Sequence, residues 1–206
     1  MKNLAVVAMI LLLSSAIVRA QEERMLTSEQ KKILLEIARK SIQEYLSTGR
    51  SYKPEVTDPE LKRPSGAFVT LERNGEFHGC IGYIEPVMPL ADAVAHMAVE
   101  AAVNDPRSPK PLRQKDLNEI SVEISVLSPL ERIKDISDIE VGKHGLLIKK
   151  GFYQGLLLPQ VATEYGWNRE EFLGHTCNKA GLPFNEWKKG VEIYIFSADV
   201  FNDAQK

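Results

Sequence analysis

The dipeptide Asn74-Gly75 separates two runs of strand-forming residues, 67–72 and 77–83. Both central residues of a type I′ turn need a positive φ, and Asn-Gly adopts this conformation more readily than other pairs. The turn twists the chain so that the flanking runs pair as antiparallel strands. The sequence therefore predicts a β-hairpin centred on these two residues, and the rest of the fold has to be built around it.

The predicted turn also sets the register of the hairpin. A literal two-residue turn pairs Leu71 with His78 and Val69 with Cys80. Side chains alternate between the two faces of a strand, so His78 and Cys80 are expected on the same face. The opposite face is expected to meet the core because it would carry three bulky apolar residues: Phe68, Phe77 and Ile81.

Hydrophobic periodicity and capping signals place the remaining elements. Helices are predicted over residues 28–48, 89–104, 159–165 and 168–180, and strands over residues 120–127, 146–148, 152–158 and 191–197. Residues 51–65 contain three prolines and are expected to be irregular. Because strands and helices do not alternate regularly, the predicted fold class is α+β, an antiparallel or mixed sheet with packed helices.

The first twenty residues have the pattern of an export signal. Lys2 precedes an apolar run over residues 4–18, and Val18-Arg19-Ala20 offers a site to signal peptidase. A run of about fifteen residues suits a signal peptide and is short for a membrane span. We therefore expect residues 1–20 to be a signal peptide whose removal leaves an exported protein, periplasmic or secreted, with no stable membrane span. An uncleaved membrane anchor is the alternative.

The mature chain, residues 21–206, is expected to fold as a single domain. It loses Lys2 and Arg19 and no acid with the signal peptide, so the formal net charge changes from −2 to −4. A nucleic-acid-binding protein needs a basic surface to neutralise phosphates. The acidic charge therefore argues against nucleic acid, and the expected partner is a small molecule or a protein.

Several motifs that would identify a chemistry are absent from the sequence. The chain has no phosphate-binding P-loop, no Cys-x-x-Cys, no His-Glu-x-x-His, no Gly-x-Ser-x-Gly and no Gly-x-Gly-x-x-Gly. Its four histidines stand far apart, so no metal site is expected. The sequence leaves the cofactor unknown.

The segment His78-Gly79-Cys80-Ile81-Gly82 is the candidate catalytic site. The glycines leave room around the Cys80 backbone, and His78 would lie about 6.5 to 7 Å away on the same face. A cationic neighbour stabilises a thiolate, which is the nucleophilic form of cysteine. We therefore expect an enzyme or redox site centred on Cys80, with His78 beside it. The alternative is a buried, inert cysteine next to a solvated histidine.

A second hypothesis is a non-catalytic binding module. Gly79 and Gly82 would offer backbone amides to a small anionic ligand or a protein, and Arg107 would offer a bidentate guanidinium. In the enzyme hypothesis, Arg107 or Glu123 would instead contribute to the thiol site. Gln160, at the start of a short predicted helix, is a further candidate for ligand binding.

The pentapeptide at residues 78–82 resembles the signature of the AMMECR domain family, of the AmmeMemoRadiSam system protein A type. The family usually has Arg at the position of His78. The similarity covers roughly residues 33–201 and continues through a series of ordered blocks: Asp105-Pro106-Arg107-Ser108-Pro109 (with Ser108 where the family usually has Phe), residues 122–128, His144-Gly145-Leu146, residues 157–167, residues 179–182 and Trp187.

The resemblance implies an α+β fold of two intimately packed lobes, with radical-SAM and Memo-type proteins as partners. An export signal would separate this chain from cytosolic radical-SAM machinery. The family is mostly cytosolic, which implies that Cys80 and Cys177 are free thiols, whereas the residues alone leave a disulfide open. The family brings no established reaction, so the resemblance leaves the biochemical activity undetermined.

Overall fold

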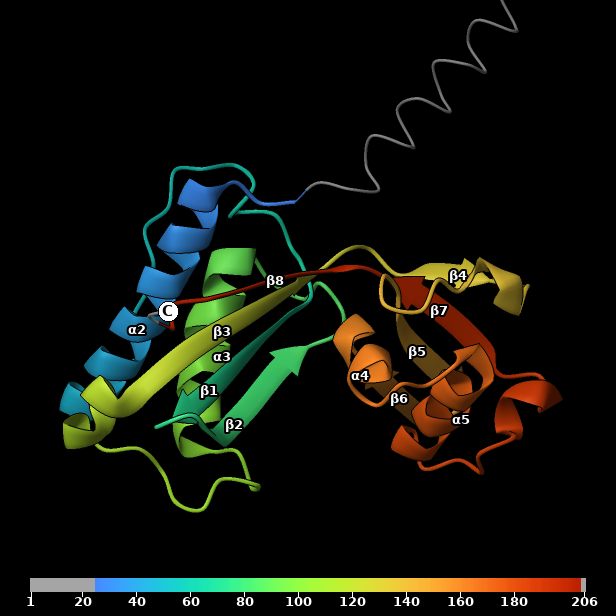
Figure 1. Ribbon diagram of the computed structural model, residues 1–206. Helices are drawn as coiled ribbons and strands as arrows, with labels where there is room; N and C mark the ends of the chain where they lie inside the picture. Colours follow the sequence, from blue (N-terminus) through green and yellow to red (C-terminus); the bar gives the residue numbers. More distant parts are fainter. Residues whose placement is uncertain (1–24, 205–206) are drawn as a thin grey trace, which may run out of the picture.

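The computed structural model describes residues 25–204 (Figure 1). The predicted signal peptide over residues 1–20 therefore lies outside the described residues. The described chain forms two lobes, each with a four-stranded sheet and helices packed on it. Every strand pair in both sheets is antiparallel. This architecture confirms the predicted α+β class.

The first lobe contains the sheet with strand order β2-β1-β3-β8. Two long helices pack on one face of this sheet, as Figure 1 shows, and a short 3-10 helix precedes β3. The elements of this lobe are α2 (Ser28–Thr48), β1 (Ala67–Arg73), β2 (Glu76–Tyr83), α3 (Leu90–Val103), η1 (Gln114–Glu119), β3 (Ile120–Leu127) and β8 (Ala198–Asn202).

The second lobe contains the sheet with strand order β4-β7-β5-β6. None of the helices in residues 25–204 combines the length and the apolar character needed to cross a bilayer. The elements of this lobe are β4 (Glu131–Ile133), η2 (Ile136–Asp138), β5 (Gly145–Lys150), β6 (Tyr153–Leu157), α4 (Pro159–Glu164), α5 (Arg169–Lys179), η3 (Glu186–Lys189) and β7 (Glu192–Phe196).

Two neighbouring segments connect the lobes, one between β3 and β4 and the other between β7 and β8. The backbone N–H of Ser128 donates to the carbonyl of Ser197, and the N–H of Ser197 donates to Oγ of Ser128, both at 2.9 Å. Lys149 of β5 also forms an ion pair at 2.6 Å with Glu85, which follows β2. The chain thus crosses between the lobes twice at one place, and β8 returns it to the first sheet.

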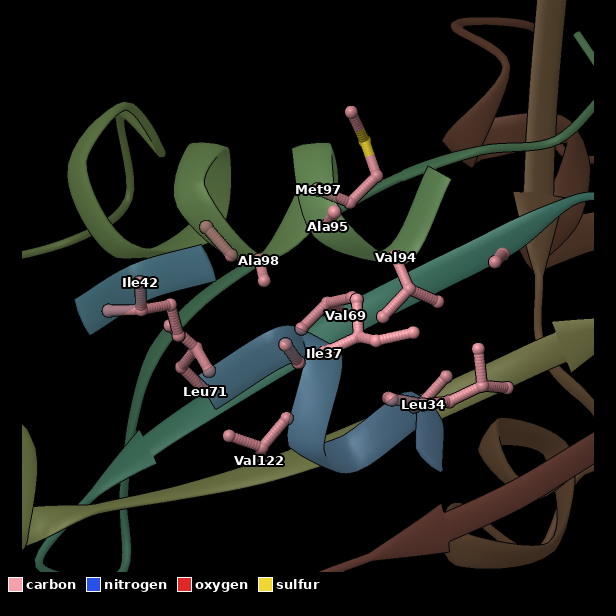
Figure 2. Packing of buried hydrophobic residues seen from close by; sticks show 14 of the residues in the cluster. Leu34, Ile37, Ile42, Val69, Leu71, Val94, Ala95, Met97, Ala98 and Val122 are labelled. Carbon is pink, nitrogen blue, oxygen red and sulfur yellow. The ribbon is translucent and has the colours of Figure 1, made fainter. Parts of the chain in front are cut away.

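The core of the first lobe lies between the two helices and one face of the sheet. Figure 2 shows apolar side chains of α2, α3, β1 and β3 meeting there, among them Leu34, Ile37, Val69, Leu71, Val94 and Val122. Burial of each such side chain stabilises the fold by about 1.5 to 3 kcal/mol. Because side chains alternate along a strand, the residues between these positions on β1 and β3 point away from the helices.

Capping signals located the first helix correctly. Thr27 caps the N-terminus of α2 in a capping box with Gln30, and Gly49 ends the helix with a φ of 72°. Asn168 and Glu171 form the predicted capping box of α5. These ends were predictable because each depends only on residues within one helical turn.

The hairpin turn also agrees with the prediction. The φ angles of Asn74 and Gly75 are 53° and 79°, both positive as a type I′ turn requires. Next to the turn, Arg73 pairs with Glu76, as a two-residue loop dictates.

The register farther from the turn was predicted wrongly. A β-bulge at His78 shifts it by one residue, so that Leu71 pairs with Gly79 and Thr70 pairs with Cys80. A bulge inserts one unpaired residue into a strand, and the hydrophobic pattern of β2 does not reveal it.

The bulge also changes which side chains share a face. Ile81 packs against the core, but Phe68 is paired with Gly82 on the opposite face and Phe77 is 48% exposed. The predicted core face of Phe68, Phe77 and Ile81 was therefore wrong for the two phenylalanines. His78 is buried against α3, whereas Cys80 lies on the other face, so the predicted shared face of these two residues was wrong as well.

Candidate functional site

Four side chains form a row across the first sheet, on the face that α2 and α3 do not cover. Cys80 of β2 pairs with Thr70 of β1, Thr70 pairs with Glu123 of β3, and Glu123 pairs with Asn202 of β8. Directly paired residues in antiparallel strands project to the same face. We call these four residues the polar row. Adjacent strands are about 4.8 Å apart, so the backbones of Cys80 and Glu123 are about 10 Å apart.

A loop after α3 holds the backbone of Cys80 from the free side of β2. The N–H of Cys80 donates to Oδ2 of Asp105 at 2.7 Å, and Nη2 of Arg107 donates to the carbonyl of Cys80 at 2.5 Å. Both backbone groups of Cys80 thus face the loop rather than β1. Thr70 and Cys80 are therefore a non-hydrogen-bonded pair, in which side chains approach most closely.

Asp105 and Arg107 form a bidentate ion pair in this loop. Nε of Arg107 donates to Oδ1 at 3.0 Å and Nη2 donates to Oδ2 at 2.7 Å. The hydrogen bond from Arg107 is the largest of the effects that lower the pKa of Asp105 to about 2, and the N–H of Cys80 acts in the same direction against the effect of burial. The carboxylate is therefore ionised at any physiological pH.

The side chain of Cys80 also influences the guanidinium of Arg107. The pKa of Arg107 is raised, mostly by its hydrogen bond to Asp105 and to a smaller extent by the charge and side chain of Cys80. The same guanidinium lies 5.2 Å from the ring centroid of Phe77. Cys80 is partly exposed, on the face of the sheet that α2 and α3 do not cover.

His78 does not take part in this arrangement. Its side chain is 2% exposed, and Nε2 donates to the carbonyl of Ala102 in α3 at 3.2 Å. The hydroxyl of Ser108 donates to the carbonyl of His78. His78 was expected beside the thiol because the two side chains were predicted to share a face of β2. In the structure they lie on opposite faces, so His78 is not positioned to act on the thiol.

The two glycines that flank Cys80 allow close packing rather than an exposed backbone. A Cβ at Gly79 would lie 2.3 Å from the carbonyl oxygen of Ala101, so this glycine lets β2 approach the end of α3. A Cβ at Gly82 would lie 2.4 Å from the ring of Phe68. Gly79 and Gly82 were predicted to offer exposed backbone amides to a ligand. Both positions are instead packed tightly against neighbouring atoms.

Glu123 is half-buried in the polar row. Burial is the largest cause that raises its pKa, and the negative charges of Glu72 and Glu164 raise it further, while a hydrogen bond from Asn202 opposes them. The carboxyl of Glu123 therefore holds a proton at a higher pH than an ordinary glutamate does.

Gln160 lies in the second lobe, in the first turn of α4. Its backbone carbonyl accepts a hydrogen bond from Thr163 at 2.7 Å. No described interaction links its side chain to the polar row. Glu164, one helical turn later in α4, does affect the polar row: its negative charge raises the pKa of Glu123.

An open groove of about 450 Å³ lies beside the hairpin and the loop after α3. It could admit a small molecule next to the strand that carries Cys80. Phe77 and His78 contribute to its wall; the other lining residues are Arg73, Asn74, Glu76, Pro109 and Lys110.

Both cysteines are free thiols, as the family resemblance implied. Cys177 is 0% exposed in the core of the second lobe, and burial raises the pKa of its thiol. Within residues 25–204, no group of three or more His, Cys, Asp and Glu side chains is placed to hold a metal ion.

Comparison with known proteins identifies the family. The family model described as AMMECR1 matches residues 35–201. The chain belongs to the AMMECR1 family. A protein of Thermococcus gammatolerans is 46% identical over 182 residues, covering 82% of this chain and 88% of its own. Protein MK0488 of Methanopyrus kandleri is 40% identical over 189 residues, covering 87% of this chain and 91% of its own.

A solved member of the AMMECR1 family supports the fold. The crystal structure of the uncharacterised protein PH0010 from Pyrococcus horikoshii superimposes with a TM-score of 0.77 at 42% identity, covering 82% of this chain and 89% of that one. These relatives carry no assigned reaction in their names, so membership establishes the fold and leaves the activity to be inferred from the site.

Sequence reasoning missed several residues of the site. Asp105 begins the segment Asp105-Pro106-Arg107-Ser108-Pro109, which resembles the family, and its position two residues before Arg107 was a usable signal for an ion pair. Thr70 could be placed opposite Cys80 only with knowledge of the bulge. Glu164 reaches the row from the other lobe, and no local pattern indicates this.

Proposed function

We propose that the protein is an enzyme in which Cys80 acts as a nucleophile on a small molecule or a peptide. The observation that carries this proposal is the environment of Cys80: the residue is partly exposed, and the guanidinium of Arg107 donates to its backbone carbonyl at 2.5 Å. A positive charge favours the thiolate, which is the reactive form. The contacts from Asp105 and Arg107 fix the backbone, and a fixed nucleophile reacts more readily than a mobile one.

Glu123 supplies the proton in this proposal. The sulfur of Cys80, having lost its proton to solvent, would form a bond to an electrophilic carbon of the substrate. The leaving group would depart with the bonding electron pair and accept a proton from the carboxyl of Glu123. A glutamate with a raised pKa suits this role because it retains its proton to a higher pH than an ordinary glutamate does.

A dithiol redox reaction fits the chain less well. Such a reaction needs a second thiol that can form a disulfide with the first. The sequence contains two cysteines, and Cys177 is completely buried in the other lobe. Covalent catalysis needs only one thiol, and Cys80 provides it.

The alternative function, a binding module for an anion, loses much of its support. Arg107 already gives two nitrogens to Asp105, and one of these also binds the carbonyl of Cys80. The bidentate edge of the guanidinium is therefore occupied. A module that binds a protein partner remains the competing explanation.

Alkylation of the folded protein tests the proposal. We expect iodoacetamide, a neutral reagent, to modify Cys80 and leave Cys177 unmodified, as measured by peptide mass spectrometry. Arg107→Gln should slow modification of Cys80 by about fivefold, because one charge at about 4 Å contributes about 1 kcal/mol in water. Arg132→Gln, which removes an exposed charge from the second lobe, is the matched control and should not change the rate.

Circular dichroism should first establish that each variant is folded. If Cys80 is not modified in the folded protein, it is not an accessible nucleophile and the binding-module function takes precedence. If Arg107→Gln and Arg132→Gln react as fast as the wild type, the guanidinium does not activate the thiol and the proposed mechanism fails.

A further inference from the structure

The turn between β5 and β6 places an aromatic residue at its outermost point. Lys150 pairs with Tyr153, so Gly151 and Phe152 form a two-residue turn. Gly151 has a φ of 60°, as the first central residue of a type II′ turn requires. A Cβ at Gly151 would meet no atom within 4 Å, so the turn projects into solvent. Phe152 is completely exposed, and Tyr153 is 57% exposed.

These two aromatic side chains differ from the other exposed aromatic residues of the described chain. Each of the other three contacts a neighbouring ring or cation: Phe77 with Arg107, Tyr165 with Trp167, and Phe184 with His175. Within residues 25–204, Phe152 and Tyr153 have no such contact. Adjacent exposed apolar side chains without partners are typical of surfaces that contact a protein or a membrane.

Two lysines beside this turn share a single carboxylate. Lys150, the cross-strand partner of Tyr153, forms an ion pair with Glu186 of η3. Lys189, at the end of η3, forms an ion pair with the same carboxylate at 3.4 Å. One negative charge therefore balances only one of the two positive charges.

A third lysine adds a charge that no described carboxylate neutralises. Tyr153 lies over the C-terminal end of α5, where a Cβ at Gly181 would be 3.7 Å from its ring. Lys179 is the last residue of α5, is exposed, and forms no ion pair within residues 25–204. Lys149, the neighbour of Lys150 in β5, is paired with Glu85 and adds no net charge.

The turn and its neighbours form one surface, which we call the lysine–aromatic tip. It consists of Lys150, Phe152, Tyr153, Lys179, Glu186 and Lys189. Three lysines and one glutamate give the tip a formal charge of +2, whereas the chain from residue 21 onward carries −4. The tip is therefore opposite in charge to the protein as a whole, and its two exposed rings lie among the positive charges.

We propose that the lysine–aromatic tip binds the surface of a bilayer that contains anionic phospholipids. Phe152 and Tyr153 enter the interfacial region, and the lysines contact the lipid phosphates. The projecting shape favours a membrane over an acidic protein, because a protein partner would need a shaped pocket for Phe152, whereas lipids rearrange around it. The tip shares no residue with the Cys80 site, so this proposal goes beyond the proposed function and does not depend on it.

Co-sedimentation with lipid vesicles tests the proposal. The protein is the chain that begins at Gln21, because the apolar run over residues 4–18 would itself bind lipid. The vesicles contain phosphatidylcholine alone or equal parts of phosphatidylcholine and phosphatidylglycerol. We expect a partition coefficient about tenfold higher on the anionic vesicles at low salt, since each net positive charge contributes about fivefold and the acidic remainder opposes it. The difference should largely disappear at about 1 M salt, where the Debye length is about 3 Å.

Single substitutions locate the binding surface. Phe152→Ser should lower the partition coefficient on anionic vesicles by about tenfold, because a large apolar side chain is lost, and Gly-Ser still suits the turn. Lys179→Gln should lower it by about three- to fivefold. Met25→Ser and Lys40→Gln change an exposed apolar residue and an exposed lysine of the first lobe, so these matched controls should bind like the wild type.

A tryptophan at the tip reports directly on insertion. Phe152→Trp should bind at least as tightly as the wild type, because tryptophan is favoured at the membrane interface. Its fluorescence emission should shift to shorter wavelength on anionic vesicles by more than that of the wild type, which contains Trp167 and Trp187. An unshifted emission from bound Phe152→Trp would show that the tip stays in water and would overturn the proposal.

The vesicle measurements can also refute the proposal. Absence of binding, or equal partitioning onto neutral and anionic vesicles, would overturn it. Binding of Phe152→Ser and Lys179→Gln at the wild-type level would place the contact elsewhere on the chain. Polyglutamate is the probe for an acidic protein. If it binds the chain, Lys179→Gln weakens that binding and vesicles do not bind, the tip is a protein-docking surface and the membrane proposal is wrong.

Discussion

Replacing Asp105 with asparagine tests how strongly the loop after α3 is attached to β2. The pKa of Asp105 is lowered from 3.8 to about 2, and a difference of this size corresponds to about 2 kcal/mol of native-state stability. The partner, Arg107, is 53% exposed, so solvent screening reduces the value of the ion pair. We therefore expect Asp105→Asn to lower the free energy of unfolding by about 1 to 2 kcal/mol at pH 7.

The loss should depend on pH in a defined direction. Asp105 has a lower pKa in the folded chain than in the unfolded chain, so its charge stabilises the fold above the unfolded value of about 3.9. This stabilisation should decline as the pH falls below about 5 and should vanish below about 2. The variant lacks the carboxyl group, so its difference from the wild type should shrink over the same range.

Urea unfolding followed by far-ultraviolet circular dichroism, between about pH 7 and pH 3.5, measures this difference. Asp138→Asn is the matched control because Asp138 is an exposed aspartate in the second lobe. The control should be as stable as the wild type within about 0.5 kcal/mol at each pH. Equal stability of Asp105→Asn and the wild type at pH 7, or a loss that stays constant down to pH 3.5, would refute the ion-pair argument.

Three further predictions concern single positions. Gly79→Ala should lower the free energy of unfolding by about 1 to 3 kcal/mol, because the added methyl would meet the carbonyl of Ala101 at 2.3 Å; an unchanged urea midpoint would contradict this. His78→Gln should leave the iodoacetamide rate of Cys80 within about twofold of the wild type, because His78 lies on the opposite face and glutamine can still donate to Ala102; a tenfold change would restore His78 to the site. We also propose that the mature chain begins at Gln21, which N-terminal sequencing of protein from the native host checks, and retention of Met1 would count against both cleavage and export.

The features that the sequence predicted correctly are those fixed by short-range chemistry. The caps of α2 and α5 and the positive φ angles at Asn74 and Gly75 each depend on a few neighbouring residues. The helix over Leu90–Val103 was recognisable because its apolar residues repeat with helical spacing. Cys80 and Arg107 were both candidates, and the structure brings them into contact.

The features that the sequence missed depend on residues far apart in the chain. The bulge at His78 accommodates the end of α3, where Ala102 accepts a hydrogen bond from the imidazole, and this contact joins residues 24 positions apart. Strand β8 is short and pairs with β3, which precedes it by more than seventy residues. Because β8 was not predicted, Asn202, the last residue of the polar row, could not be placed. Because the bulge was not predicted, Phe77 and His78 were each assigned to the wrong face of β2.

The surroundings of Cys80 depend on the position of β2 at the edge of the first sheet. β2 is the outermost strand, and an outermost strand presents unpaired backbone groups that can bind other chains. Here side chains from one loop satisfy those groups: Asp105 binds the N–H of Cys80, Arg107 binds its carbonyl, and Ser108 binds the carbonyl of His78. A further strand in that place would bind these groups with its backbone, whereas the loop binds them with the side chains of Asp105, Arg107 and Ser108. The contacts that protect the edge therefore also hold the guanidinium of Arg107 next to Cys80, and changes at Asp105 should affect the stability of the lobe and the reactivity of Cys80 together.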